Sequence, residues 1–310
     1  MTIVVAGGTG LAGSAIVRAY QATGAEVIAL NRSVVDLLDR EATTAFLKKV
    51  KPSLVVDAAA KVGGIGANNA FPVEFLSDNV RIQSNLMEAA HGADVEKFIF
   101  LGSSCIYPRD CAQPIKEEYL LTGPLEETNS AYAIAKIAGI ELIKSFRKEY
   151  GRTWISLMPT NLYGPNDNFE LQGSHVLPAF IRRFVEAAQN KVPTETLWGT
   201  GSPKREFLHV DDLAAAVVHL GSTYDSPQHL NIGTGEDLTI KALAELVAEL
   251  AGFEGEIAWD STKPDGTPRK VLDVTKVKSL GWAPKISLRD GIASTIAWYK
   301  DASAKGVARR

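Results

Sequence analysis

Three glycines near the N-terminus constrain this chain more than any other feature. Gly7, Gly10 and Gly13 lie three residues apart, between the apolar, β-branched run 3–6 and the helix-forming stretch 14–22. A glycine turn between a strand and a helix is typical of dinucleotide binding, because it permits a tight turn, close approach to a pyrophosphate and close packing of helix on strand. The pattern predicts a Rossmann-type domain. The cofactor contacts expected from this turn are Gly7, Gly10, Leu11 and Gly13.

Short apolar runs alternate with helical patterns along the first half of the chain. The expected strands are 26–30, 54–58, 98–102 and 154–158, and the expected helices are 40–50, 75–91 and 131–150. This alternation predicts an α/β fold with a doubly wound parallel sheet. A turn-rich break follows residue 163. We therefore expect a Rossmann domain over 1–163, to which segments near 207–233 return, and a smaller C-terminal α/β substrate lobe over 164–310 that ends in a loose tail, 304–310.

The composition argues against several classes of protein. The chain has 310 residues and a formal net charge of -3, so no overall positive field attracts nucleic acid or membrane. No apolar run is long enough to span a bilayer, and the N-terminus lacks a basic secretory start. We expect a cytoplasmic protein in which Cys105 and Cys111 are free thiols, although a disulfide between them stays possible. His91, His209, His219 and His229 show no metal-ligand spacing with acids or cysteines, so no metal site is expected.

The end of the second expected strand bears on the choice of cofactor. NAD-binding domains usually place an acid there, to bind the ribose 2′-hydroxyl. This strand instead ends in Asn31 and Arg32. No acid would repel a 2′-phosphate and Arg32 could pair with one, which favours NADP, although Arg32 could also be a solvated loop cation. Asp39 either contacts the adenine end of the cofactor or caps the helix 40–50.

Tyr132 and Lys136 lie four residues apart in the expected helix 131–150, and so share one face. A nearby cation favours phenolate and is expected to lower the pKa of Tyr132, which would make it a proton donor or acceptor near neutral pH. Taken alone, this spacing also fits an exposed helix. Ser103 follows the fourth expected strand, at the edge that faces the cofactor crevice, and we expect it to hydrogen-bond the substrate oxygen beside Tyr132.

The glycine turn, Ser103 and the Tyr132–Lys136 pair together resemble the extended short-chain dehydrogenase/reductase superfamily. Longer blocks resemble the GDP-L-fucose synthase family more closely, and they extend over nearly the whole chain: 58–65, 101–108, 132–139, 158–165, 205–212 and 263–270. The resemblance implies NADPH-dependent 3,5-epimerisation and 4-reduction of GDP-4-keto-6-deoxy-D-mannose to GDP-L-fucose. It also implies a homodimer through helices 75–91 and 131–150. Members of this family often carry Arg where Thr9 stands. The expected contact with the 2′-phosphate therefore depends more on Arg32.

The resemblance also implies roles for particular residues. Cys105 would be the base and His175 the acid that invert C3 and C5, because a C4 ketone acidifies both positions. Tyr132 would protonate the alkoxide formed at C4, Ser103 would polarise the ketone, and Lys136 would also hold a ribose hydroxyl. Further cofactor contacts are expected at Leu101, Lys136, Pro159, Asn161, Leu162 and His175. GDP-sugar contacts are expected at Arg183, Trp198, Arg205, Asp265 and Lys270.

Two alternatives stay open. Another nucleotide-sugar 4-reductase or 4-epimerase would carry the same tyrosine and lysine, but a plain 4-reductase needs no second acid/base pair, so Cys105 and His175 discriminate. A protein that senses a dinucleotide without turnover would have the same scaffold. The intact set of Ser103, Tyr132 and Lys136 speaks against that reading. Cys111 has no expected role.

Overall fold

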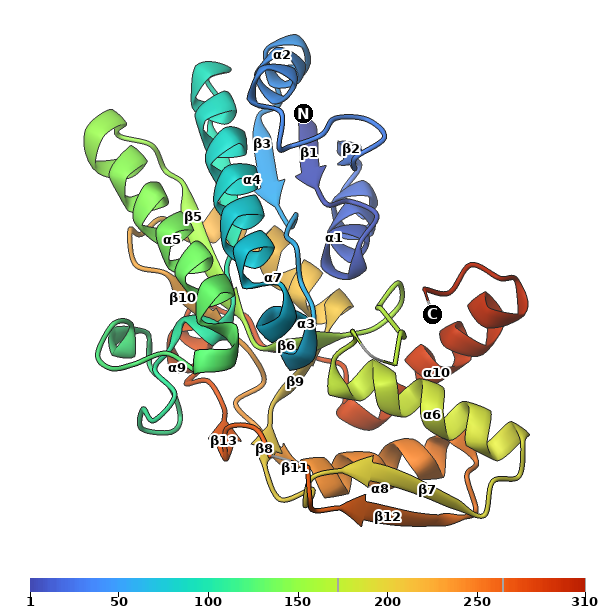
Figure 1. Ribbon diagram of the computed structural model, residues 1–310. Coiled ribbons are helices and arrows are strands. Elements are labelled where there is room, and N and C mark those ends of the chain that lie inside the picture. Colours follow the sequence, from blue (N-terminus) through green and yellow to red (C-terminus); the bar gives the residue numbers. More distant parts are fainter. Residues whose placement is uncertain (172, 264, 310) are drawn as a thin grey trace.

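A parallel sheet of six strands, in the order β10-β5-β4-β3-β1-β2, forms the centre of the larger part of the molecule (Figure 1). This computed structural model describes residues 1–171, 173–263 and 265–309. The strands are β1 (Thr2–Ala6), β2 (Glu26–Leu30), β3 (Leu54–Asp57), β4 (Lys97–Leu101), β5 (Ile155–Pro159) and β10 (Leu230–Ile232). The apolar runs of the sequence form the inner strands, because both faces of a parallel sheet are buried.

Helices cover both faces of this sheet. On one face α2 (Arg40–Val50) packs on α4 (Pro72–Gly92), and α4 packs on α5 (Ser130–Tyr150). On the other face α1 (Leu11–Ala22) packs on α7 (Val210–Thr223). The predicted doubly wound Rossmann fold is therefore confirmed, and its strands β3, β4 and β5 end at one common edge.

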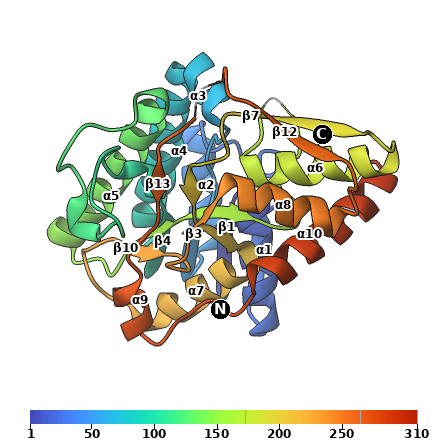
Figure 2. The same ribbon diagram turned by 90° about the horizontal axis from the view of Figure 1, so that it is seen from below.

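A second, smaller hydrophobic core lies beside that edge (Figure 2). Three helices surround it: α6 (Val176–Gln189), α8 (Ile240–Ala251) and α10 (Leu288–Ala304). Short strands complete this lobe. β7 (Thr194–Trp198) pairs in parallel with β12 (Glu256–Asp260), while β8 (Lys204–Arg205) lies between β11 (Leu238–Thr239) and β13 (Arg269–Lys270).

The remaining elements lie between the two cores or at the rim of the sheet. β6 (Asn161–Tyr163) pairs in parallel with β9 (Phe207–His209), and these strands carry the chain between the sheet and the lobe. Short helices are α3 (Ile65–Ala70) and α9 (Thr275–Ser279), and 3₁₀ turns span Ser104–Ile106, Glu117–Tyr119 and Glu127–Asn129. No helix in the described ranges is both long and apolar enough to cross a membrane.

The C-terminal residues differ from the expected loose tail. α10 continues to Ala304, and the Phe169 amide donates a hydrogen bond to the Arg309 carbonyl at 3.0 Å. The Arg309 guanidinium also donates to the carbonyl of Thr9 in the glycine turn, at 3.2 Å. The prediction was therefore wrong for the tail up to residue 309. Arg310 lies outside the described residues, as does Pro264 of the block 263–270.

Candidate active site

The glycine turn has the shape that a dinucleotide needs. Gly7 has a φ of +72°, in the left-handed region that glycine adopts freely. A Cβ on Gly13 would lie 2.1 Å from the Gly7 carbonyl oxygen, so only glycine lets α1 approach β1 this closely. Gly10 begins α1 without a side-chain cap. The first helical N–H groups therefore stay available for phosphate oxygens, beside Leu11.

The end of β2 leaves room for a phosphorylated ribose. The Asn31 side chain accepts hydrogen bonds from the backbone and hydroxyl of Ser33, at 2.9 and 2.6 Å. Arg32 is exposed beside it. Asp39 caps α2 by accepting from the Ala42 amide at 2.9 Å, the second of its two expected roles. No carboxylate at this strand end opposes a 2′-phosphate, so the residues present fit NADP.

Lys136 is the most buried of the expected catalytic residues. Its ammonium donates a hydrogen bond to the Leu101 carbonyl at 2.9 Å, and lies 4.8 Å from the centre of the Phe100 ring. The same nitrogen is 5.9 Å from the centre of the Tyr132 ring, so the two residues do share one face of α5. Burial lowers the pKa of Lys136, and the charge of Asp57 opposes that change.

The pKa of Tyr132 moves opposite to the prediction. Burial raises it, the charge of Cys105 raises it further, and only a hydrogen bond with the Ser103 side chain acts to lower it. The predicted lowering by Lys136 was therefore wrong for this structure, because spacing along a helix says nothing of desolvation. The phenol stays protonated at neutral pH. That state suits a donor of a proton to an alkoxide rather than a base.

Ser103 and Cys105 are held by the turn that follows β4. Ser103 begins the 3₁₀ turn Ser104–Ile106, and its hydroxyl accepts from the Cys105 amide at 3.2 Å. Cys105 is half-buried, and its sulfur lies 3.5 Å from the Lys270 ammonium, which donates to it. Neighbouring cations stabilise the thiolate, the form that removes protons. The cation comes from β13, far along the chain.

Two more predicted site residues, Arg205 and His175, lie near Cys105 or its partner Lys270. Arg205 and Lys270 are register partners in β8 and β13, so their side chains leave the sheet on one face. Burial lowers the pKa of Arg205, and the charges of Cys105, Glu126 and Asp265 oppose this. His175 begins α6 and is reached by solvent, yet surrounding protein lowers its pKa, as does the charge of Lys270. Lys270 thus contacts the thiol and lowers the pKa of the imidazole.

The expected nicotinamide contacts lie at the ends of neighbouring strands. Leu101 and Pro159 end β4 and β5, and Leu162 lies in β6 just after Pro159. The Asn161 side chain donates to the Glu206 carbonyl at 2.8 Å, which ties this segment to the start of β9. These residues are therefore at the edge of the sheet where Ser103 and Lys136 also lie, as the carboxyl ends of parallel strands require.

The other expected GDP-sugar contacts lie further out on the lobe. Arg183 forms an ion pair with Glu195 and donates to the Thr196 carbonyl at 2.6 Å, so its charge is partly offset. Trp198 is exposed, with the Lys263 ammonium 5.6 Å above its ring. Asp265 accepts from the amide and hydroxyl of Thr200, at 3.0 and 2.6 Å. The contacts recorded for these three side chains do not reach Cys105 or Lys270.

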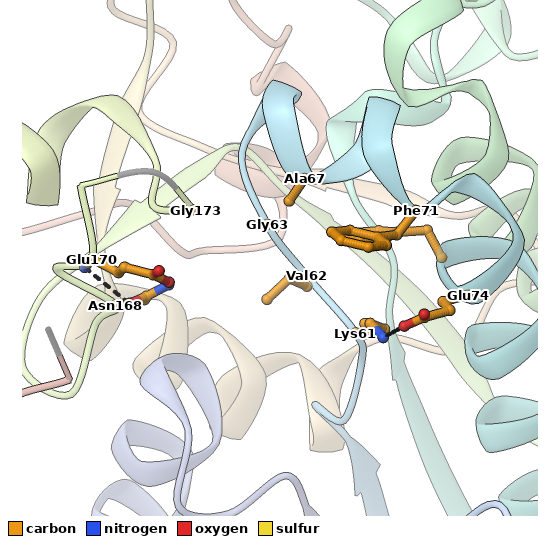
Figure 3. A pocket seen from close by; sticks show the side chains of 10 residues that line it. Lys61, Val62, Gly63, Ala67, Phe71, Glu74, Asn168, Glu170 and Gly173 are labelled. Atoms are coloured by element: carbon orange, nitrogen blue, oxygen red, sulfur yellow. Dashed lines mark hydrogen bonds and ion pairs between the residues drawn. The ribbon is translucent and has the colours of Figure 1, made fainter.

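A cavity of about 250 Å³ lies beside α3 and the start of α4 (Figure 3). Lys61 and Glu74 form an ion pair on one side, and Asn168 and Glu170 lie on the opposite side. Phe75 also lines the cavity, and its ring meets the Tyr132 ring edge-on with centres 6.4 Å apart. None of the five predicted catalytic side chains lines this cavity.

Sequence reasoning missed two buried carboxyl groups. Asp57 ends β3 and is fully buried, and its pKa is raised to about 6 by burial, against the charge of Lys136 and a hydrogen bond from the Ala59 amide. Glu206 accepts from the amides of Thr234, Gly235 and Leu272, at 2.6, 2.8 and 2.9 Å. A signal existed for each: an acid that ends a buried strand, and an acid directly after Arg205. Within the described ranges no group of three or more potential ligands could hold a metal ion.

Comparisons with known proteins agree with this geometry. Residues 3–233 match the model of the NAD dependent epimerase/dehydratase family. The chain is 54% identical over 298 residues to GDP-L-fucose synthase 1 of Arabidopsis thaliana, covering 96% of this chain and 92% of that protein. A GDP-L-fucose synthetase from Naegleria fowleri bound to NADP is 28% identical, with a TM-score of 0.91, and covers 100% of this chain and 96% of that one. A GDP-6-OMe-4-keto-L-xylo-heptose reductase from C. jejuni is 33% identical, with a TM-score of 0.91 and 97% of both chains covered.

Proposed function

The chain belongs to the NAD dependent epimerase/dehydratase family, and from that premise we propose that it converts GDP-4-keto-6-deoxy-D-mannose to GDP-L-fucose by NADPH-dependent 3,5-epimerisation and 4-reduction. Similarity to GDP-L-fucose synthases over nearly the whole chain supports this assignment. The observation that carries it is the contact of 3.5 Å between the Cys105 sulfur and the Lys270 ammonium, beside Ser103 and Tyr132. A simple reductase has no need of a supported thiolate there.

The two inversions use the acidity that the C4 ketone confers on C3 and C5. The Cys105 thiolate, held by Lys270, removes a proton from one face of each carbon in turn. His175 then returns a proton to the opposite face. Before the second inversion the Cys105 thiol loses its proton to solvent and His175 takes one up, so both groups are reset. A pKa below the ordinary value makes the imidazolium of His175 a stronger acid, and it also lowers the fraction of His175 that carries the proton at neutral pH. The hydroxyl of Ser103 donates a hydrogen bond to the ketone oxygen, where negative charge develops in the enolate.

The reduction needs one hydride and one proton. A bound NADPH supplies the hydride at C4. The protonated Tyr132 delivers the proton to the C4 oxygen, and its raised pKa keeps it in the acid form until the alkoxide develops. Lys136 lies behind the tyrosine on the same helix and supplies positive charge as phenolate forms.

The nucleotide part of the substrate is anionic and carries a flat base. We assign Arg205 and Lys270 to bind the end of the diphosphate nearest the sugar, since their side chains project from adjacent strands on one face. The exposed Trp198, with Arg183 and Asp265, is assigned to the outer part of the GDP. On the cofactor side, Arg32 is assigned to the 2′-phosphate, and the N-terminus of α1 to the pyrophosphate.

The decisive experiment measures deuterium exchange at C3 and C5 of the keto-sugar nucleotide in heavy water, by NMR, without NADPH. Cys105→Ser should slow this exchange about 100-fold or more, because a positioned acid or base contributes about 10² to 10⁴. With NADPH added, the variant should still reduce some substrate, to the 6-deoxy sugar that is not epimerised. Cys111→Ser, in the same loop, is the matched control and should exchange like the wild type. Unchanged exchange in Cys105→Ser would remove this residue from the mechanism.

The same assay separates the remaining alternatives. The similarity to a GDP-keto-heptose reductase supports a plain 4-reductase as the alternative. Such an enzyme would oxidise NADPH without exchange at C3 or C5. A protein that only senses a dinucleotide would neither oxidise NADPH nor catalyse exchange at C3 or C5 with any keto-sugar nucleotide. The wild type should show both activities.

Assembly, location and division into lobes form part of the proposal. A homodimer through α4 and α5 is supported by exposed apolar side chains on both helices, among them Val73, Leu76 and Ile134. Light scattering coupled to gel filtration tests it, and a monomer at micromolar concentration would argue against it. We assign residues 1–163, with segments near 207–233, to the cofactor domain and 164–310 to the substrate lobe, in a cytoplasmic enzyme.

A further inference from the structure

Asp57 is a buried acid that the mechanism above does not use. It is fully shielded from solvent at the end of β3. One carboxyl oxygen accepts a hydrogen bond from the Ala59 amide at 3.1 Å. The other oxygen is buried and receives no hydrogen bond from any residue that the structure describes. A buried carboxyl group with a free oxygen is costly unless a positive charge lies nearby.

The sheet register directs this carboxyl group toward Lys136. Asp57 and Phe100 are register partners in β3 and β4, so their side chains leave the sheet on the same face. The Lys136 ammonium lies over the Phe100 ring on that face, 4.8 Å from its centre. Carboxyl group and ammonium therefore lie on the same face of the sheet, close enough for each charge to act on the other.

Lys136 has capacity for a second partner. An ammonium has three N–H donors, and the one recorded hydrogen bond of Lys136 goes to the Leu101 carbonyl at 2.9 Å. Lys136 is buried, so a neutral amine would be favoured over a charged one if no counter-charge were close. Asp57 supplies that counter-charge from the strand next to the one that carries Leu101.

We propose that Asp57 is a positioning residue, whose carboxylate keeps the Lys136 amine charged and aligned beneath Tyr132. This deepens, and rests on, the proposed function, because it adds a third member to the Tyr132–Lys136 pair. The groups facing Asp57 are few. α5 contributes Lys136 and Tyr132, β1 contributes its register partner Ala6, and β4 contributes Phe100. From α4 the neutral Gln83 lies beside the Phe100 ring, near Gly139.

The pairing has a defined pH dependence. The pKa of Asp57 is raised to about 6, so its negative charge is present at neutral pH and is lost as the pH falls through about 6. The Asp57 charge raises the pKa of Lys136, and its loss lowers that pKa. Below about pH 6 the Lys136 amine stays charged but loses the carboxylate that aligns it, so reduction should weaken there in the wild type. The rate of reduction by Asp57→Asn should not show this fall at acidic pH. Its fall at alkaline pH should begin at a lower pH than in the wild type.

The first test is the pH profile of the 4-reduction in Asp57→Asn. Asparagine keeps the shape and the acceptor for the Ala59 amide but loses the charge. We expect kcat to fall about tenfold at pH 8, the effect of one pKa unit, with KM for the nucleotide sugar within about twofold. Asp212→Asn is the control. That buried carboxylate accepts from the Lys285 and Ile286 amides at 3.0 and 2.9 Å, so its loss should lower stability without moving the pH profile.

The second test needs no turnover, so it separates this proposal from the proposed function. The Asp57 carboxyl carbon is followed by ¹³C NMR against pH in the wild type and in Lys136→Met. Loss of the ammonium should raise the Asp57 midpoint above about 6, because the Lys136 charge lowers it in the intact protein. An unchanged midpoint, or an Asp57→Asn profile that superimposes on that of the wild type, would overturn the proposal. If Asp57→Asn does not fold, the titration alone decides.

Discussion

At the scale of single residues, burial and neighbouring charge together set the pKa of the titratable groups in the candidate site. Burial raises the pKa of Tyr132 and lowers that of Lys136, while Asp57 and Lys136 each oppose the effect of burial on the other. The result is a proton donor and a cation side by side, rather than a phenolate. A cation from a distant segment also touches Cys105, because the Lys270 ammonium lies 3.5 Å from its sulfur.

Burial and neighbouring charge also predict how stability depends on pH at His229. This buried side chain contacts the Tyr107 hydroxyl at 3.1 Å, and burial together with Lys144 and Lys276 lowers its pKa to about 4. An unfolded histidine titrates near about 6.5, so the unfolded chain binds the proton first and stability is lost as the pH falls from about 6.5 toward 4.

Urea unfolding at pH 7.5 and pH 5.0 measures this loss. At pH 5, proton uptake by His229 in the unfolded chain should lower the free energy of unfolding by about 2 kcal/mol. This follows from the difference of about 1.5 units between pH 5 and the pKa of the unfolded histidine. His229→Gln should have a lower free energy of unfolding than the wild type at pH 7.5. On acidification to pH 5.0, however, this free energy should fall by about 2 kcal/mol less than it does in the wild type. An equal loss in both proteins would show that another group controls the acid response.

At the scale of elements, the turn from β1 into α1 is the most tightly determined contact. A Cβ on Gly13 would lie 2.1 Å from the backbone oxygen of Gly7, whereas a Cβ on Gly92, at the end of α4, would meet nothing within 4 Å. Both positions are helical glycines without a left-handed φ. The two sites therefore differ in space and not in backbone conformation.

Gly13→Ala should lower the free energy of unfolding by about 1–3 kcal/mol, because overpacking forces backbone shifts. Gly92→Ala should be neutral or stabilising by up to about 1 kcal/mol, because alanine restricts the unfolded chain. Urea denaturation measures both, and titration of NADPH fluorescence should show weaker binding only in Gly13→Ala. Equal stability of the two variants would mean that α1 moves away from β1 without cost.

At the scale of the whole molecule, the C-terminal residues contact the glycine turn that follows β1. The guanidinium of Arg309 donates to the Thr9 carbonyl, and its charge also lowers the pKa of the buried Asp167, against the larger effect of burial. A positive charge from the last turn of the chain thus lies at the turn that would hold an anionic dinucleotide. Thr9 itself carries no charge there.

Arg309→Ala should weaken NADPH binding a few-fold at low salt, and by less at high salt, because ions screen an exposed charge. Arg289→Ala is the matched control, since this exposed arginine lies on α10 and pairs with Glu249, away from the glycine turn. Fluorescence titration at two salt concentrations measures both. The same affinity in both variants at low salt would limit Arg309 to a structural role.

Much of this protein could be predicted from its sequence. Strand and helix periods lie within short windows, so the glycine turn, the alternation and the strand-end position of Ser103 predicted the sheet and the edge at which the site lies. What the sequence could not supply came from contacts between distant segments. Lys270 reaches Cys105 across 165 positions, and Arg309 reaches Thr9 across 300. No local pattern records such distances.

The sequence by itself determined the fold class, the cofactor turn and the set of side chains offered for chemistry, because spacing along one strand or helix is a local property. Only the tertiary structure decided the protonation state of Tyr132, the cation beside Cys105 and the carboxyl group beside Lys136. Desolvation and charge pairing depend on which residues surround a group from every side, and those neighbours come from β3, β4, α5 and β13 together.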